Sequence, residues 1–110
     1  MEKHRPDHDL ERIKELISKK RCRVTITAQQ FGHELCFSAT DIQDVILELD
    51  QKNFTKSITE KINSKAWQDV YRTKFGNLDL YIKLKIGVVD GEALAIILSF
   101  KEYGEERTKP

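Results

Sequence analysis

The sequence predicts an α+β protein in which N-terminal helices pack on one face of a mainly antiparallel sheet. Three observations support this prediction. Apolar residues recur at helical spacing in the first half of the chain, whereas after Asn53 they alternate with polar residues as in half-buried strands. A capping pattern precedes one helical segment, and Asp90-Gly91 separates the last two alternating segments. Because the helices precede the strands instead of alternating with them, an antiparallel meander with helices on one face is the expected architecture.

Length and composition indicate a single soluble domain. The chain has 110 residues, of which 39% are hydrophobic and 34% charged, and we expect residues 1–103 to form the domain and residues 104–110 to be a flexible tail. No segment resembles a membrane span or the apolar core of a signal peptide, so an intracellular, cytoplasmic protein without membrane contact is expected. Cys22 and Cys36 are expected to be buried or partly buried thiols. The histidine and cysteine spacings are not those of zinc sites, so no metal site is expected.

The first predicted helix covers residues 9–19. Its apolar residues recur at helical spacing and would form one buried stripe, made of Leu10, Ile13, Leu16 and Ile17. Asp7 or Asp9 can accept hydrogen bonds from the first free amide groups. The cations at positions 19–21 complement the negative end of the helix dipole, which explains this basic run without nucleic acid.

Two shorter segments follow before the sheet. Residues 23–27 are rich in β-branched side chains and predict a brief strand or an extended linker. Thr27 would then cap a short helix over residues 28–35. A capping box, Ser38-Ala39-Thr40-Asp41, predicts the start of a helix over residues 39–49. The exposed side of that helix is acidic and would repel a phosphate backbone, so we expect it to be scaffold.

Strand character is found in four segments after Asn53, which are residues 54–59, 67–74, 79–86 and 93–101. Alternation is clearest in the third segment, where apolar and polar residues point to opposite sides: Leu80, Ile82, Leu84 and Ile86 against Asp79, Tyr81, Lys83 and Lys85. In the last segment, alternation would divide the two faces between Ile96, Leu98 and Phe100 and, opposite them, Ile97, Ser99 and Lys101. The pattern therefore predicts a polar, aromatic sheet face that no helix covers.

The segment Trp67-Gln68-Asp69-Val70-Tyr71-Arg72 is the most informative one for function. It places aromatic, amide and basic side chains on a predicted strand, within the basic region 54–85, which holds seven Lys/Arg and three Asp/Glu residues. Aromatic rings can stack on bases and cations attract phosphates, so the region favours an anionic ligand such as RNA. A solvated basic face explains the charge distribution almost equally well.

RNA cleavage is chemically feasible with these residue types, although no phosphate-binding loop, nucleophile elbow or metalloprotease motif occurs. The 2′-hydroxyl of RNA can attack its own neighbouring phosphate, so the protein needs no nucleophile. It must orient that hydroxyl, balance the charge on the phosphoryl oxygens and protonate the leaving 5′-oxygen. Lysine and arginine can supply charge, glutamine a donor, and tyrosine or lysine a proton. A lysine close to Tyr81, such as Lys83, would favour its phenolate.

Four sequence blocks resemble the motility quorum-sensing regulator (MqsR) toxin family in order and spacing: FTKSIT at 54–59, WQDVYR at 67–72, LYIKL at 80–84 and ILSFKE at 97–102. The opening, MEKHRPDHDLERIKELI, is also similar, so the resemblance covers about residues 1–103. It implies a fold similar to the RelE-like ribonuclease toxins of type II toxin–antitoxin systems. It also implies a metal-independent endoribonuclease, without a cofactor, that cleaves mRNA at GC-containing triplets without the ribosome.

The resemblance places the family's active-site residues at Lys56, Gln68, Tyr81 and Lys101. We expect the two lysines to balance phosphate charge, the tyrosine to act as acid or base, and the glutamine to orient the substrate. Arg72 and Lys83 are expected to contact the RNA backbone. Strict alternation would put Lys56 on the same side as Phe54, so we expect a bulge there or a strand that begins after Phe54.

The resemblance also implies partners. Each family toxin is neutralised by an MqsA-type antitoxin, which has a zinc-binding N-terminal part and a helix-turn-helix DNA-binding part. The expected ligands are therefore mRNA, an MqsA-like antitoxin, and promoter DNA bound only through the toxin–antitoxin complex. Two alternatives stay open on the residues themselves: a non-catalytic RNA- or DNA-binding module that uses the same basic–aromatic face, and an adaptor whose exposed strand edge pairs with a partner.

Overall fold

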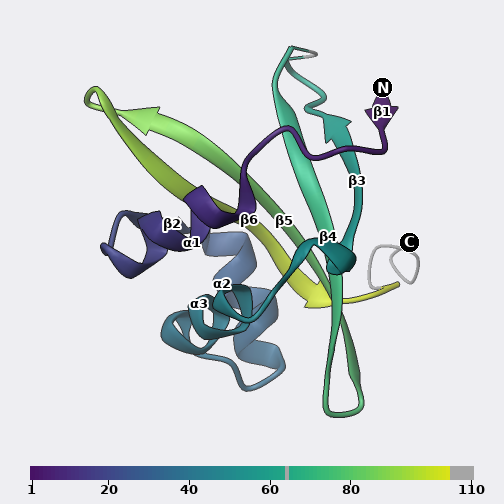
Figure 1. Ribbon diagram of the computed structural model, residues 1–110. Coiled ribbons are helices and arrows are strands. Elements are labelled where there is room, and N and C mark those ends of the chain that lie inside the picture. Colours follow the sequence, from purple (N-terminus) through teal and green to yellow (C-terminus); the bar gives the residue numbers. More distant parts are fainter. Residues whose placement is uncertain (64, 105–110) are drawn as a thin grey trace.

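The computed structural model describes residues 1–63 and 65–104, which form helices packed with one six-stranded sheet (Figure 1). The elements in chain order are β1 (Glu2–Lys3), α1 (Leu10–Ser18), β2 (Cys22–Val24), α2 (Ile26–Glu34), α3 (Ala39–Leu47), the 3-10 turn η1 (Gln51–Asn53), β3 (Phe54–Thr59), β4 (Trp67–Phe75), β5 (Leu78–Val89) and β6 (Glu92–Glu102). The strand order is β1-β3-β4-β5-β6-β2. Within the described residues, neighbouring strands are antiparallel except β2, which is parallel to β6. The predicted α+β class is confirmed. Of the expected tail, residues 105–110 lie outside the described chain.

The helices begin where side chains cap their first amide groups. Asp9 accepts from the Glu11 amide at the start of α1, and the predicted capping box at the start of α3 is present, with Ser38 and Asp41 each accepting from the other's amide. The prediction for α2 was two residues late. Thr25, rather than Thr27, has extended backbone and accepts from the Ala28 amide, because β2 already ends at Val24. Each of these helices has nine residues, and no helix in the described chain is long and apolar enough to span a bilayer.

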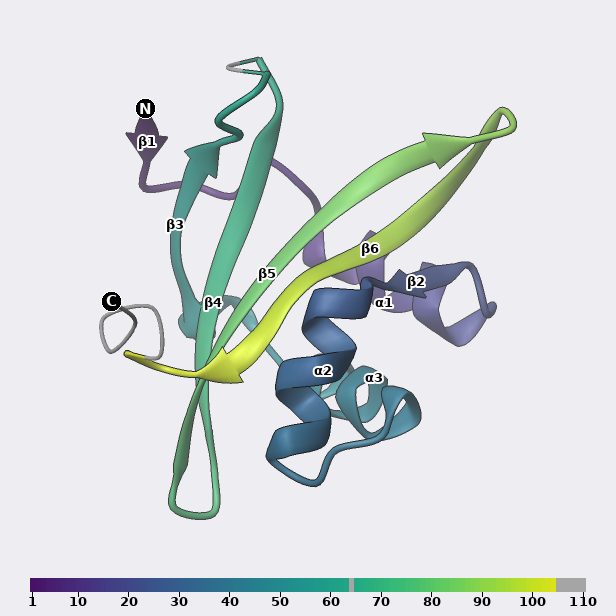
Figure 2. The same cartoon turned by 180° about the vertical axis from the view of Figure 1, so that it is seen from behind.

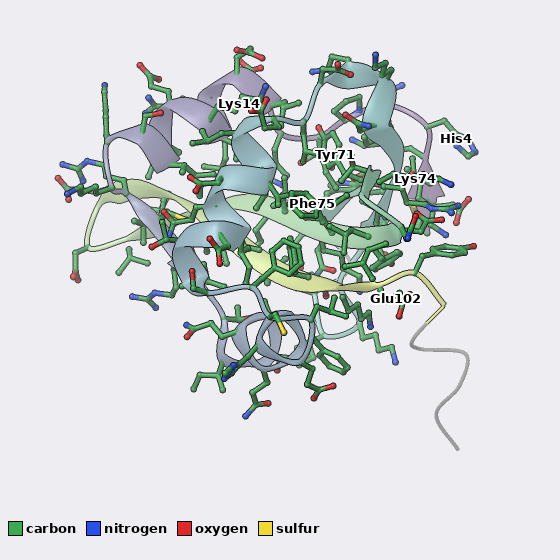
Figure 3. The ribbon with its side chains drawn as sticks, turned by 90° about the horizontal axis from the view of Figure 1, so that it is seen from below. His4, Lys14, Tyr71, Lys74, Phe75 and Glu102 are labelled. Atoms are coloured by element: carbon green, nitrogen blue, oxygen red, sulfur yellow. The ribbon has the colours of Figure 1, made fainter. Side chains whose placement is uncertain are left out.

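The core lies between the sheet and the helices α1 and α3, and α2 closes it beside β6, where Ala28 and Gly32 are buried (Figure 3). Tyr71, labelled in that figure, is fully buried in the core. The fully buried large side chains come from both layers: Leu10, Ile13, Leu16, Ile42, Ile46, Leu49, Tyr71, Leu80, Ile82, Leu84, Ile97 and Phe100. Asp90 and Gly91 have positive φ angles of 52° and 78°, as a tight hairpin turn requires, and the predicted β5–β6 hairpin is confirmed.

A buried carboxylate joins the N-terminal segment to the middle of the sheet. Asp69 of β4 is fully buried on the helix side. Its oxygens accept hydrogen bonds from the amides of Asp7 and His8, at 3.1 and 2.8 Å, and from the Ser57 hydroxyl at 2.7 Å. These charge-assisted bonds fix the path of the chain just before α1.

The His8 ring fills the gap that opens between β4 and β5. The Ile86 amide donates to Nδ1 at 3.3 Å, so Nε2 carries the proton and donates to the Trp67 carbonyl at 2.9 Å. Paired residues of these two strands begin only at Asp69 and Leu84. The imidazole therefore bridges β4 and β5 where the two strands separate and no longer form backbone hydrogen bonds with each other.

The cysteines differ in their surroundings. Both are free thiols, but only Cys22 is partly buried, and burial raises its pKa to about 11. Cys36 is exposed, contrary to the prediction, because it follows α2 in a left-handed turn conformation with φ of 68°.

Replacing the Asp69 carboxylate should destabilise the fold. Asp69→Asn retains one acceptor oxygen but leaves a buried N–H donor group and weakens the bonds from Asp7 and His8, so we expect a loss of about 2–4 kcal/mol in the free energy of unfolding. Urea denaturation at neutral pH measures this loss. Asp44→Asn, on the exposed side of α3, is the matched control and should change stability by less than about 0.5 kcal/mol. Equal effects of the two variants would contradict the role given to Asp69.

Candidate active site

The sheet face opposite α1 and α3 carries the residues expected to act on RNA. Figure 2 shows this face, on which β4 and β5 cross without a helix in front of them. The strand register and the alternation of side chains place six residues here, namely Lys56, Gln68, Arg72, Tyr81, Lys83 and Lys101. Their neighbours along the strands, such as Asp69, Ile82 and Phe100, are buried on the other face. All the sequence-predicted site residues therefore share one face.

A bulge in β3 brings Lys56 to this face. The register shifts between Phe54 and Lys56, so that Phe54 lies opposite Tyr71 and Lys56 opposite Val70. The Phe54 ring packs edge-on against Tyr71 in the core, with the ring centroids 5.5 Å apart. The expected bulge is confirmed. Phe54 and Lys56 are two positions apart and would share a face in a regular strand, but the bulge places them on opposite faces.

A second bulge, in β6, brings Lys101 to the same face. Lys83 lies opposite Ser99 and Leu84 opposite Ile97, which leaves Leu98 as the extra residue. The prediction that Lys101 shares a face with Ile97, and Phe100 with Ile96, was therefore wrong. Phe100 shares the buried side with Ile97, and Lys101 lies opposite Tyr81.

Thr25 holds the β6 bulge in place. Its amide donates to the Ile97 carbonyl at 3.1 Å and its hydroxyl donates to the Leu98 carbonyl at 3.2 Å. The same hydroxyl oxygen caps α2. One side chain thus connects the start of α2 to the irregular point of β6 from which Lys101 is positioned.

Tyr81 lies at the centre of the candidate site. It is the direct cross-strand neighbour of Arg72 on β4 and of Lys101 on β6. The ammonium groups of Lys101 and Lys83 lie 5.6 and 5.9 Å from the centre of its ring. Two cations therefore lie close to one phenol, a combination that can attract a phosphate and supply a group able to transfer a proton.

Arg72 is held in one orientation by two neighbours. Its guanidinium pairs with the Asp79 carboxylate at 2.6 Å and stacks on the Tyr103 ring at 3.5 Å. Tyr103 in turn lies 6.4 Å from Tyr81, measured between ring centroids. A guanidinium fixed in this way offers its remaining donors in a defined direction.

Two aromatic residues beside the site were missed in the sequence. Tyr103 follows Lys101 by two positions, so alternation along β6 would have indicated it. Phe31, whose ring centre is 5.5 Å from the Lys101 ammonium, comes from α2, and no local pattern in the sequence links the two. Both rings offer surfaces near the cations on which bases could stack.

Lys56 and Gln68 lie farther from Tyr81 than the other candidates. From the register and ordinary strand dimensions, their Cα atoms are about 12 and about 14 Å from that of Tyr81. Lys56 pairs with Glu2 of β1 at 3.7 Å. Near Gln68, the pKa of Glu60 is lowered chiefly by its hydrogen bond with Lys85 and also by the Gln68 side chain. The structure thus brings Tyr81, Lys83, Arg72 and Lys101 together and sets Lys56 and Gln68 apart.

Comparison with known proteins assigns the family. The family described as motility quorum-sensing regulator, toxin of MqsA, matches residues 5–102. The chain belongs to this family. It is also 32% identical over 102 residues to the mRNA interferase toxin MqsR of Escherichia coli K12, a match that covers 93% of this chain and 99% of that protein. The matched region includes every strand of the candidate site, and the predicted family is confirmed.

Loss of the Thr25 hydroxyl should disturb the bulge as well as the helix. We expect Thr25→Val to lower the free energy of unfolding by about 1–2 kcal/mol, because the cap of α2 is lost. It should also shift the amide NMR signals of residues 98–101, whereas Thr25→Ser should retain them. Ser38→Ala is the matched control, since it removes the cap of α3 but no contact to β6. A Thr25→Val spectrum unchanged at residues 98–101 would contradict the positioning role.

Proposed function

We propose that this MqsR-family chain is an endoribonuclease that cleaves mRNA and thereby inhibits translation and growth, as the toxin of a type II toxin–antitoxin system. Family membership and the name of the Escherichia coli relative support this proposal. The observation that carries it is the row Arg72–Tyr81–Lys101 across three strands of the sheet face opposite α1 and α3, with Lys83 beside it. This row supplies a proton-transfer group among cations, the set that the chemistry of RNA cleavage needs.

The proposed reaction uses the 2′-hydroxyl of RNA as the nucleophile. Its oxygen forms a bond to the adjacent phosphorus while the bond from phosphorus to the 5′-oxygen breaks, which leaves a 2′,3′-cyclic phosphate and a 5′-hydroxyl. Lys101 and Lys83 offset the negative charge that gathers on the phosphoryl oxygens. Two protons move: one leaves the attacking 2′-hydroxyl and one reaches the leaving 5′-oxygen. Tyr81 carries one of these transfers, and a neighbouring lysine or a water molecule carries the other. Arg72, held by Asp79 and Tyr103, positions the RNA backbone.

Lys56 and Gln68 are assigned to the RNA on either side of the reacting phosphate. Their distance from Tyr81 suits contacts along an extended strand better than contact with the same phosphate. Lys56 would offset the charge of a backbone phosphate, in competition with Glu2. Gln68 would orient the substrate through an amide hydrogen bond.

The finer features of the proposal follow from the family resemblance and from this chemistry. Because the substrate provides the nucleophile and lysines offset the charge, we propose that cleavage requires no metal ion. From the family resemblance, we propose that it does not require the ribosome either. We propose GC-containing triplets as the cleavage sites. The proposed inhibitor is an MqsA-like antitoxin with zinc-binding and helix-turn-helix parts, and promoter DNA would be bound only through that complex. The cytoplasm, where mRNA is available, is the proposed location.

Variants of the row should lose activity in the presence of a chelator. With a defined transcript in EDTA, we expect Tyr81→Phe and Lys101→Ala to lower kcat about 10²–10⁴-fold, since each removes a group used in the transition state. Lys56→Ala and Gln68→Ala should chiefly raise KM. Primer extension gives both the rates and the cleavage sites. Lys19→Ala, at the C-terminal end of α1 in the opposite layer, is the control and should cleave normally.

The same experiment separates the alternative function. Salt-sensitive binding of RNA that stays intact with the wild-type chain would contradict the enzymatic proposal and indicate a non-catalytic binding module. Undiminished cleavage by all four site variants would instead contradict the assignment of the site.

A further inference from the structure

A polar pocket lies beside the candidate site, where β4 extends past the start of β3. Phe54 is the first residue of β3 paired with β4, opposite Tyr71, so residues 72–75 of β4 are paired only with β5. The pocket in this corner has a volume of about 360 Å³. Neither the family resemblance nor the sequence patterns assigned any function to it.

The pocket is lined by cations and neutral donors. Lys52 of η1 and Arg72 and Lys74 of β4 contribute positive charge, and Asn53 and Thr55 add an amide and a hydroxyl. Asp79 also lines the pocket, but its carboxylate is engaged by Arg72 at 2.6 Å. Lys52 pairs with Asp50 at 3.8 Å, and this pair is largely exposed and therefore weak. A net positive pocket with such donors is chemically suited to a phosphate.

Arg72 connects this pocket to the candidate site. It lines the pocket and is also the direct cross-strand neighbour of Tyr81. Lys74 is two positions after Arg72 in β4, so both side chains lie on the same face of the strand. They form a row of cations that leads from Tyr81 to the pocket. An RNA strand whose reacting phosphate lies at Tyr81 can therefore reach the pocket with an adjoining phosphate.

We propose that the pocket of Lys52, Arg72 and Lys74 is a subsite for a backbone phosphate of the RNA that flanks the cleaved linkage. The inference rests on the proposed function, because it takes the reacting phosphate to lie at Tyr81. Lys52 and Lys74 hold the flanking phosphate as point charges, and the fixed Arg72 links it to the reacting one. The subsite orients the strand without contacting the reacting atoms.

Binding of a non-cleavable RNA tests the subsite independently of catalysis. The probe is a 2′-O-methyl RNA containing the cleavage sequence, measured by fluorescence anisotropy at several salt concentrations. We expect Lys52→Gln/Lys74→Gln to weaken binding about 10-fold and to reduce the salt slope by about 0.7, the value for one phosphate contact on a single strand. Lys14→Gln/Lys19→Gln, in α1 and at its C-terminal end, removes the same charge from the opposite layer and is the matched control. It should change neither quantity.

A scan with neutral methylphosphonates locates the contact. One linkage next to the cleaved one should weaken binding to the wild type when it is neutralised, and the same change should have no further effect in Lys52→Gln/Lys74→Gln. Additive effects at every linkage, or equal loss of affinity in the control variant, would overturn the proposal. So would saturation of the pocket by inorganic phosphate with no change in RNA affinity, since the site would then serve a free anion.

The two proposals fail in distinguishable ways. Suppose that the wild type leaves unmodified RNA intact, while neutralising one linkage still weakens binding only when Lys52 and Lys74 are present. In that case the enzymatic function fails and the subsite stands as a binding site. If cleavage occurs but no linkage is coupled to Lys52 and Lys74, the subsite alone fails.

Discussion

The buried carboxylate of Asp69 is the interaction on which the arrangement of this molecule depends. It holds the amides that precede α1 and the hydroxyl of Ser57 on β3, so it joins the N-terminal segment to two strands at once. The same segment delivers His8 into the gap between β4 and β5. Asp69 lies between Gln68 and Val70, whose side chains point to the other face. Anchoring on the helix side thus leaves the opposite face of β4 available for function.

Two bulges then decide which charges reach that face. The irregularity after Phe54 turns Lys56 outward while the phenyl ring stays in the core. The one at Leu98 turns Lys101 toward Tyr81 and is held by Thr25. Without the second bulge, Lys101 would point to the side of the helices. The rigid centre of the sheet therefore carries Tyr81, and two local departures from regular pairing place the lysines around it.

The sequence predicts those helices, strands and turns whose formation depends on residues close together in the chain. The alternation of β5, the capping box at Ser38 and the Asp90-Gly91 hairpin were predictable because period, cap and turn are properties of neighbouring residues. The contact of Thr25 with the bulge at Leu98, the parallel pairing of β2 with β6 and the bonds from Asp7 and His8 to Asp69 join residues more than 50 positions apart. The periodicity of the sequence does not encode them. The same limit applies to the site. Tyr81 and Lys83 follow from one strand, whereas Phe31 and the pocket at Lys52 require the assembled fold.

The central claim is that the sheet face opposite α1 and α3 cleaves RNA by means of the substrate's own 2′-hydroxyl, with Tyr81 and its lysines as the protein's contribution. Mass spectrometry of the ends produced from a defined oligoribonucleotide in EDTA tests this claim most directly. The account predicts 2′,3′-cyclic phosphate and 5′-hydroxyl ends, and no cleavage when the nucleotide before the cut carries 2′-hydrogen. Ends with 3′-hydroxyl and 5′-phosphate, or cleavage of the 2′-deoxy substrate, would contradict it.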